Sequence, residues 1–178
     1  MKVIDTKFDG LKIIRHDVYK DRRGYLRVTH DQKINKKKNF VFEYCTNSRK
    51  NALRGFHFQH KFQQAKYVSV IKGKILDCVI DLRKESKMFG KYFKIILSEK
   101  NSLSLYIPEG FAHGYYSYEK ENIIYYKLTN YYRPQYEDGI NILDKKLKIK
   151  WPSKKLLISL KDKKLKSLND FKKNYKYL

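Results

Sequence analysis

Short segments rich in aromatic and β-branched residues recur along this chain, and glycine, asparagine or other turn residues separate them. We expect strands at residues 25–29, 40–45, 66–71, 75–82, 92–97, 104–107, 115–118 and 123–128. Gly73, which lies between two lysines, predicts a hairpin turn that joins residues 66–71 to residues 75–82. Many short strands with turns between them are typical of a β-sandwich or a β-barrel.

The end of the chain has a different pattern. Apolar residues recur at a helical spacing of three or four, and lysines occupy the positions between them; these apolar residues are Leu165, Leu168, Phe171, Tyr175 and Leu178. The pattern predicts a helical tail over about 163–178. A basic amphipathic helix can bind a membrane or a nucleic acid, but a terminal helix that packs on the barrel is the favoured interpretation. With 178 residues, we expect a single domain over residues 1–178 with a core of its own.

The chain is strongly basic, with 41 Lys and Arg residues against 18 Asp and Glu residues, a formal charge of +23. One interpretation is a partner that carries phosphate; the favoured one is a lysine-rich solvated surface. Cys45 and Cys78 are too few for a disulfide framework. No apolar run reaches membrane-spanning length, and the first residues have no apolar core of a signal peptide, so we expect a cytoplasmic protein without a membrane partner.

Two phrases each place one histidine beside a glycine at the edge of a β-rich segment. The first is Leu53-Arg54-Gly55-Phe56-His57-Phe58-Gln59, and the second is Ile107-Pro108-Glu109-Gly110-Phe111-Ala112-His113-Gly114. His57 and His60 have the spacing of two metal ligands, but no acidic residue follows them and Lys61 would oppose a cation. We therefore expect no metal at these histidines.

These phrases, together with several others in the same order, resemble the nucleotide-sugar 3,5-epimerases of the dTDP-4-dehydrorhamnose 3,5-epimerase type. The other phrases are Gln64-Ala65-Lys66, Asp81-Leu82-Arg83-Lys84-Glu85-Ser86, Phe89-Gly90-Lys91, Leu97-Ser98-Glu99-Lys100-Asn101, Tyr126-Lys127-Leu128-Thr129-Asn130-Tyr131-Tyr132, Trp151-Pro152 and Ser159-Leu160-Lys161-Asp162. The resemblance implies a mainly β cupin (jelly-roll) barrel with short helices, no cofactor, and a homodimer formed by strand exchange.

The resemblance also implies a reaction: inversion of C3, C5 or both in a nucleotide-linked 4-keto sugar, through an enolate. It assigns His57 as the base and Asp162 as the carboxylate that orients this histidine. Tyr126 is the implied proton donor on the opposite face of the sugar, and Lys66 the implied stabiliser of the enolate oxygen.

The residues that the resemblance implies for substrate binding are Arg23, Arg54, His113, Glu137 and Lys161. Arginine suits phosphate because its planar fork donates two hydrogen bonds at once. Structural roles stay open for three of the implied site residues: Tyr126 as a core residue beside Tyr125, Arg23 as a solvated turn residue, and Asp162 as a helix cap.

The chain departs from the dTDP enzymes at positions that contact the nucleotide. Val28 stands where they have a glutamate, and Phe42-Glu43-Tyr44 replaces Gln-x-Asn. Apolar residues cannot replace these hydrogen bonds to a pyrimidine. The carrier is therefore dTDP, GDP or CDP, and the sugar a 4-keto-6-deoxyhexose or, in a GDP-heptose-type member, a 4-keto-heptose.

The expected product enters a surface polysaccharide, such as O-antigen or capsule. Two other classes stay open. One is a cupin that binds a nucleotide sugar without catalysis. The other is a nucleic-acid-binding protein, for which the charge and the tyrosines argue, although no nucleic-acid module is visible and none is expected as a partner.

Overall fold

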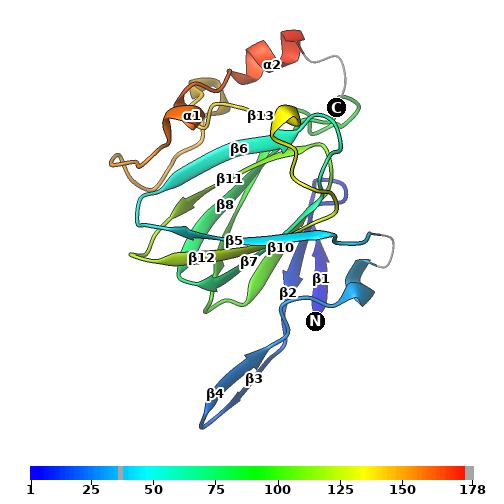
Figure 1. Cartoon of the computed structure of the whole chain (residues 1–178), viewed down its shortest axis with the longest axis vertical. Helices are drawn as coiled ribbons and strands as arrows, with labels where there is room; N and C mark the ends of the chain where they lie inside the picture. Colours follow the sequence, from blue (N-terminus) through cyan, green and yellow to red (C-terminus); the bar gives the residue numbers. More distant parts are fainter. Residues whose placement is uncertain (36–37, 175–178) are drawn as a thin grey trace.

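A computed structural model of the chain describes residues 1–35 and 38–174. Two antiparallel sheets face each other (Figure 1). The first sheet contains, in spatial order, β1 (Lys2–Asp5), β2 (Lys12–Arg15), β10 (Leu103–Ile107), β7 (Lys66–Lys72), β12 (Asn122–Leu128) and β5 (Phe42–Ser48). The second contains β13 (Glu137–Gly139), β6 (Leu53–Gln59), β11 (Phe111–Ser117), β8 (Lys74–Asp81) and β9 (Tyr92–Ser98). This architecture confirms the mainly β barrel expected from the sequence.

The main core lies between the two sheets and follows from the alternation of side chains along a strand. In β12, every second residue is buried, and Ile124 and Tyr126 point into the core beside Val68 of β7 and Val79 of β8. Residues of opposite parity on β8 and β11, such as Ile80, enter a second core on the other face of this sheet. Because both faces are covered, β8 and β11 are almost continuously buried.

The C-terminal part of the chain covers the outer face of the second sheet (Figure 1). It includes the 3-10 helices η2 (Pro134–Tyr136) and η3 (Lys145–Leu147), then α1 (Leu160–Lys163) and α2 (Leu168–Asn174); a further 3-10 helix, η1 (Gln32–Asn35), precedes β5. Leu168 and Phe171 are buried in the second core, so the packed tail helix is confirmed. No helix in residues 1–35 and 38–174 is long and apolar enough to cross a membrane.

The tail helix begins later than the expected residue 163. The Ser167 hydroxyl accepts a hydrogen bond from the Asp170 backbone amide at 3.2 Å and donates to the Asp170 side chain, which caps the first turn. Before it, Lys166 forms a parallel β-bridge with Ile140 and cannot be helical. Tyr175 and Leu178, which belong to the same expectation, lie outside the described residues.

The expected hairpin at Gly73 is wrong, because β7 and β8 belong to different sheets. Gly73 has φ +84°, and an added Cβ would lie 2.5 Å from the carbonyl oxygen of Glu121. The chain therefore turns tightly here but crosses from one sheet to the other. Each strand then pairs with neighbours in its own sheet, β7 with β10 and β12, and β8 with β9 and β11.

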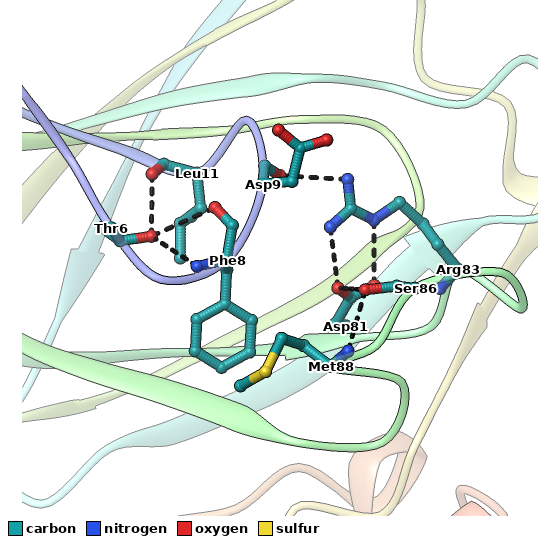
Figure 2. A network of polar contacts seen from close by, with 8 residues as sticks. All are labelled: Thr6, Phe8, Asp9, Leu11, Asp81, Arg83, Ser86 and Met88. Atoms are coloured by element: carbon teal, nitrogen blue, oxygen red, sulfur yellow. Dashed lines mark hydrogen bonds and ion pairs between the residues drawn. The ribbon is translucent and has the colours of Figure 1, made fainter.

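A polar network fixes the β1–β2 loop to the loop that follows β8 (Figure 2). The Arg83 guanidinium donates to both oxygens of the fully buried Asp81, at 2.9 and 2.7 Å, and to the Asp9 carbonyl at 3.0 Å. Ser86 also donates to Asp81, at 2.7 Å. The Asp-Leu-Arg-Lys-Glu-Ser segment thus connects two loops at one end of the barrel. Phe8, in the β1–β2 loop that it holds, is buried in the main core.

A two-stranded hairpin, β3 (Val18–Asp21) and β4 (Gly24–Arg27), projects from the barrel at the end away from the C-terminal helices (Figure 1). Tyr19, Tyr25 and Leu26 are 57–63% exposed on it. Arg23 lies at its tip, where its guanidinium pairs with Asp21 at 2.7 Å.

Candidate active site

Two glycines bring β6 and β11 unusually close together. Gly55 has φ +111°, and a Cβ there would lie 2.5 Å from the Gly114 Cα. A Cβ on Gly114 would lie 2.7 Å from the Arg54 carbonyl oxygen. Any larger residue would separate the strands. The close approach sets His57 directly opposite His113 in the strand register, which explains the glycine beside each histidine.

His57 is held by a buried carboxylate. Its Nε2 lies 2.9 Å from Oδ1 of Asp162, a residue of α1 that is 4% exposed. The other Asp162 oxygen accepts the Gly55 backbone amide at 3.1 Å. Burial alone would raise the pKa of Asp162, but the hydrogen bonds from His57 and Gly55 outweigh it and hold this pKa below its usual value. Asp162 is therefore a carboxylate at neutral pH, and Nδ1 is the imidazole nitrogen left to accept a proton.

Lys66 and Tyr126 reach the same space from the first sheet. Lys66 is 8% exposed, and its Nζ lies 3.4 Å from the His57 carbonyl oxygen. Burial lowers the pKa of Lys66 to about 8. Tyr126 is 3% exposed, and burial raises the pKa of its phenol well above the usual value, so the phenol stays protonated. Its ring stacks on Tyr44 of β5, with centroids 4.7 Å apart.

His113 has a carboxylate partner of its own. Its Nε2 lies 2.7 Å from Oδ2 of Asp77 on β8, and both side chains are buried. The Asp77 Oδ1 has no hydrogen-bond partner in the described part of the chain. Two His–Asp pairs therefore stand side by side on neighbouring strands.

Charged groups continue along the rim. Glu137 of β13 forms an ion pair with Lys161 of α1 and accepts a hydrogen bond from Tyr132 at 2.6 Å. Burial alone would raise the pKa of Glu137, but these two contacts outweigh it and lower this pKa. Arg54 donates from Nε to the Ser48 hydroxyl at 3.0 Å, which leaves the rest of its guanidinium for a ligand.

Most of these groups line one cleft of about 790 Å³, within the usual range of small-molecule sites. It contains His57, Lys66, Tyr126, Asp162, Arg54, His113, Glu137 and Lys161. Of the catalytic and substrate-binding residues that the sequence predicts, Arg23 alone lies elsewhere, at the tip of the projecting hairpin. Base and acid candidates come from opposite sheets, so a flat ligand between them would meet one on each face.

Comparisons with known proteins agree with this site. A family model described as dTDP-4-dehydrorhamnose 3,5-epimerase matches residues 5–170. The chain belongs to this family. The dTDP-4-dehydrorhamnose 3,5-epimerase of Methanothermobacter thermautotrophicus is 39% identical over 176 residues, which cover 95% of each chain. The Shigella flexneri enzyme of the same name is 37% identical and covers 91% of this chain and 93% of its own.

Solved structures of family members have the same fold. The Legionella pneumophila dTDP-6-deoxy-D-glucose-3,5-epimerase, in complex with dTDP-4-keto-L-rhamnose, superposes with a TM-score of 0.91. It is 37% identical, over 94% of this chain and 93% of its own. The Sulfolobus tokodaii dTDP-4-dehydrorhamnose 3,5-epimerase gives a TM-score of 0.87 at 36% identity, over 95% and 97%. This epimerase-family chain is accordingly an isomerase that acts on a nucleotide sugar.

Sequence reasoning missed Asp77 and Tyr115 of this epimerase site, and it named Tyr44 only as a departure from the family. Asp77 stands inside the apolar run of residues 75–82, where a carboxylate needs a buried partner, and that mismatch was a usable signal. Tyr44 lines the cleft against Tyr126, whereas Val28 and Phe42 are not among its described lining residues. Tyr115 is also part of the lining, and nothing in its surroundings along the chain distinguishes it from a core tyrosine.

No group of three or more His, Cys, Asp and Glu side chains that could hold a metal ion occurs in residues 1–35 and 38–174.

Proposed function

We propose that this protein inverts one or both carbons next to the ketone of a nucleoside-diphosphate-linked 4-keto sugar. One observation carries the proposal: a histidine paired with a buried carboxylate and a buried phenol face the same cleft from opposite sheets. Inversion needs a base on one face of the sugar ring and an acid on the other. Family membership supports the same reaction.

His57 removes the proton from the carbon next to the ketone. Nδ1 accepts it, and Asp162 stabilises the resulting imidazolium through the hydrogen bond at Nε2. The electrons of the broken C–H bond move to the ketone oxygen and form an enolate. The ammonium of Lys66, next to His57 and shielded from water, stabilises the charge on that oxygen.

Tyr126 then gives its phenolic proton to the same carbon from the other side. A phenol with a raised pKa is an unfavourable acid in isolation, so the enolate must be a stronger base than the phenolate for the transfer to proceed. The configuration of the carbon is inverted because the proton leaves on one face and arrives on the other.

The diphosphate occupies the positive part of the rim. Arg54 offers there the N–H groups that do not bind Ser48. The ion pair between Lys161 and Glu137 fixes both of these side chains at the edge of the cleft. His113, held by Asp77, presents its remaining ring nitrogen to a sugar hydroxyl. The names of the relatives specify dTDP, and this supports dTDP as the nucleotide that carries the sugar.

The changes at Val28 and at Phe42 and Tyr44 keep GDP and CDP as carriers to be tested, with a 4-keto-heptose as the alternative sugar.

A homodimer is part of the proposal. Arg23 projects with exposed aromatic residues on a hairpin that leaves its own barrel, so this arginine would serve the cleft of a second copy. The surface-polysaccharide pathway and a cytoplasmic location rest on the sequence resemblance.

The deciding experiment is incubation in deuterium oxide with dTDP-, GDP- and CDP-linked 4-keto sugars, followed by mass spectrometry and proton NMR. A gain of one or two deuterons identifies the carrier and counts the inverted centres. If the folded protein binds a sugar nucleotide but causes no exchange, the non-catalytic binding role replaces this proposal. Sedimentation equilibrium of the wild type tests the dimer, and the KM of Arg23→Ala, if this variant sediments as the wild type does, tests the role of this arginine.

A further inference from the structure

We propose that Tyr44 is a positioning residue for the proton donor: its ring lies flat on the Tyr126 ring and shields that ring from the solvent in the cleft. The inference rests on the proposed function, because it concerns the acid of that reaction. The reaction itself assigns no role to Tyr44, which stands where the dTDP enzymes have an asparagine.

The strand register brings the two rings together. Tyr44 of β5 and Tyr126 of β12 stand directly opposite each other in an antiparallel pair, so their side chains lie on the same face of the sheet. Their ring centroids are 4.7 Å apart, and the ring planes differ by 19°. Stacked rings at this distance limit each other's rotation, which fixes the direction in which the Tyr126 hydroxyl points.

Two other neighbours of Tyr126 belong to the interior of the barrel. The ring of His113, which Asp77 holds, meets the Tyr126 ring edge to face with centroids 5.9 Å apart. Val68 of β7 is the partner of Tyr126 on the other side of β12. Tyr44, in contrast, comes from β5, the last strand of the first sheet. Its removal therefore opens the Tyr126 ring from the edge of the sheet while the contacts from the interior remain.

The exposed fractions show which of the stacked rings faces the solvent. Tyr44 is 37% exposed and lines the cleft, whereas Tyr126 is 3% exposed. Because the rings are stacked, the part of the Tyr126 ring that Tyr44 covers would meet water without it. Burial is the main cause that raises the pKa of the Tyr126 phenol and keeps it protonated. An asparagine, with its short polar side chain, could not provide this cover.

A displaced donor changes the fate of the enolate. After His57 has broken the C–H bond, Tyr126 can protonate the carbon on the opposite face, which inverts it, or His57 can return a proton on the original face, which restores the starting configuration. The His57 side chain is 28% exposed, so its proton exchanges with solvent. In deuterium oxide the second route leaves deuterium in sugar that is not inverted. The ratio of inversion to exchange therefore measures how well the donor is placed.

Two substitutions of Tyr44 separate its ring from its hydroxyl. Tyr44→Leu keeps an apolar side chain but removes the ring, and it should lower kcat for inversion by about 2- to 13-fold, the contribution of one aromatic pair. It should also lower the ratio of inversion to exchange, because His57 is intact. Tyr44→Phe keeps the ring and should keep the wild-type ratio. Proton NMR in deuterium oxide reads the configuration and the deuterium content of each sugar. An unchanged ratio in Tyr44→Leu overturns the inference.

Tyr118→Leu is the matched control. Tyr118 is half-buried, and its ring meets the buried ring of Tyr116 with centroids 5.0 Å apart. It packs on the second core and is not among the described lining residues of the cleft. Both leucine variants should lose some thermal stability, but Tyr118→Leu should keep the kcat and the inversion-to-exchange ratio of the wild type. If Tyr118→Leu lowers the ratio as much as Tyr44→Leu does, the ratio follows stability and the inference is overturned.

A second measurement does not depend on turnover. In protein with carbon-13 in its tyrosine rings, the ring signals of Tyr126 are assigned by their loss in Tyr126→Phe. Protons that lie over an aromatic ring resonate upfield, so Tyr44→Leu should move these signals downfield and Tyr118→Leu should not. A downfield shift together with a wild type that neither inverts nor exchanges any sugar refutes the proposed function and leaves the contact between the tyrosines standing. No shift in Tyr44→Leu refutes the contact, whatever the activity.

Discussion

Asp162→Asn tests the central assignment of the site, the His57–Asp162 pair. The substitution keeps the shape of the side chain, and its amide oxygen can still accept the Gly55 amide that lies 3.1 Å away. What it removes is the negative charge 2.9 Å from His57 Nε2, against which the imidazolium is stabilised. A hydrogen bond to a charged group contributes about 1.5–3 kcal/mol, so kcat should fall by about 10- to 150-fold.

The assay is deuterium incorporation into the accepted 4-keto sugar at saturating substrate, with circular dichroism as a check on folding. Asp138→Asn is the matched control: it removes a carboxylate that pairs with Lys166 at 2.7 Å and does not line the cleft as described. Its kcat should equal that of the wild type. If folded Asp162→Asn exchanges deuterium as fast as Asp138→Asn, His57 does not work through this carboxylate.

Three further outcomes follow from buried charges. The value of kcat should fall as the pH rises through about 8, which is the pKa of Lys66. Only the charged form of Lys66, present below that pH, stabilises an enolate. A pH profile of kcat that stays flat to pH 10 contradicts this role of Lys66. Arg83→Met should lower the free energy of unfolding, measured in urea, by about 3–5 kcal/mol with kcat unchanged, since Asp81 loses its charged partner. A smaller loss means that Ser86 and the backbone amide of residue 83 satisfy this carboxylate. Burial, followed by the charge of Arg27, lowers the pKa of His16 to about 4. Between pH 6.5 and pH 4 the unfolded chain therefore binds more protons than the folded chain. The free energy of unfolding should fall by up to about 3 kcal/mol as the pH falls through that window, and by much less in His16→Gln.

The sequence predicted the fold class from local patterns, whereas the residues of the cleft were predicted from the resemblance to the epimerase family. Segments rich in aromatic and β-branched residues indicated the strands, and the two glycine–histidine phrases indicated histidines at the edges of β-rich segments. The close approach of β6 and β11 at Gly55 and Gly114 was seen only in the structure. The hairpin predicted at Gly73 was wrong because a turn residue reports local backbone geometry and not the sheet to which the next strand belongs.

Residues whose roles depend on contacts between distant strands could not be predicted. Tyr115 is one of 16 tyrosines, and its partners Thr46 and Ser48 lie more than 60 positions away along the chain. Its hydroxyl meets these partners only when β5 and β11 are assembled. Arg23 is the opposite case: the sequence phrase singles it out, but in a single chain the hairpin carries it away from the cleft.

The two neighbouring His–Asp pairs raise the question of which histidine is the base, and burial answers it. The His57 side chain is 28% exposed, whereas that of His113 is 5% exposed and its carboxylate is fully buried. A base must exchange its proton with solvent between turnovers, which favours His57. Glutamine at either position keeps a donor for the carboxylate but has no basic nitrogen. His57→Gln should therefore abolish deuterium exchange, and His113→Gln should raise KM while exchange continues. If folded His113→Gln also loses all exchange, the buried pair takes part in proton removal.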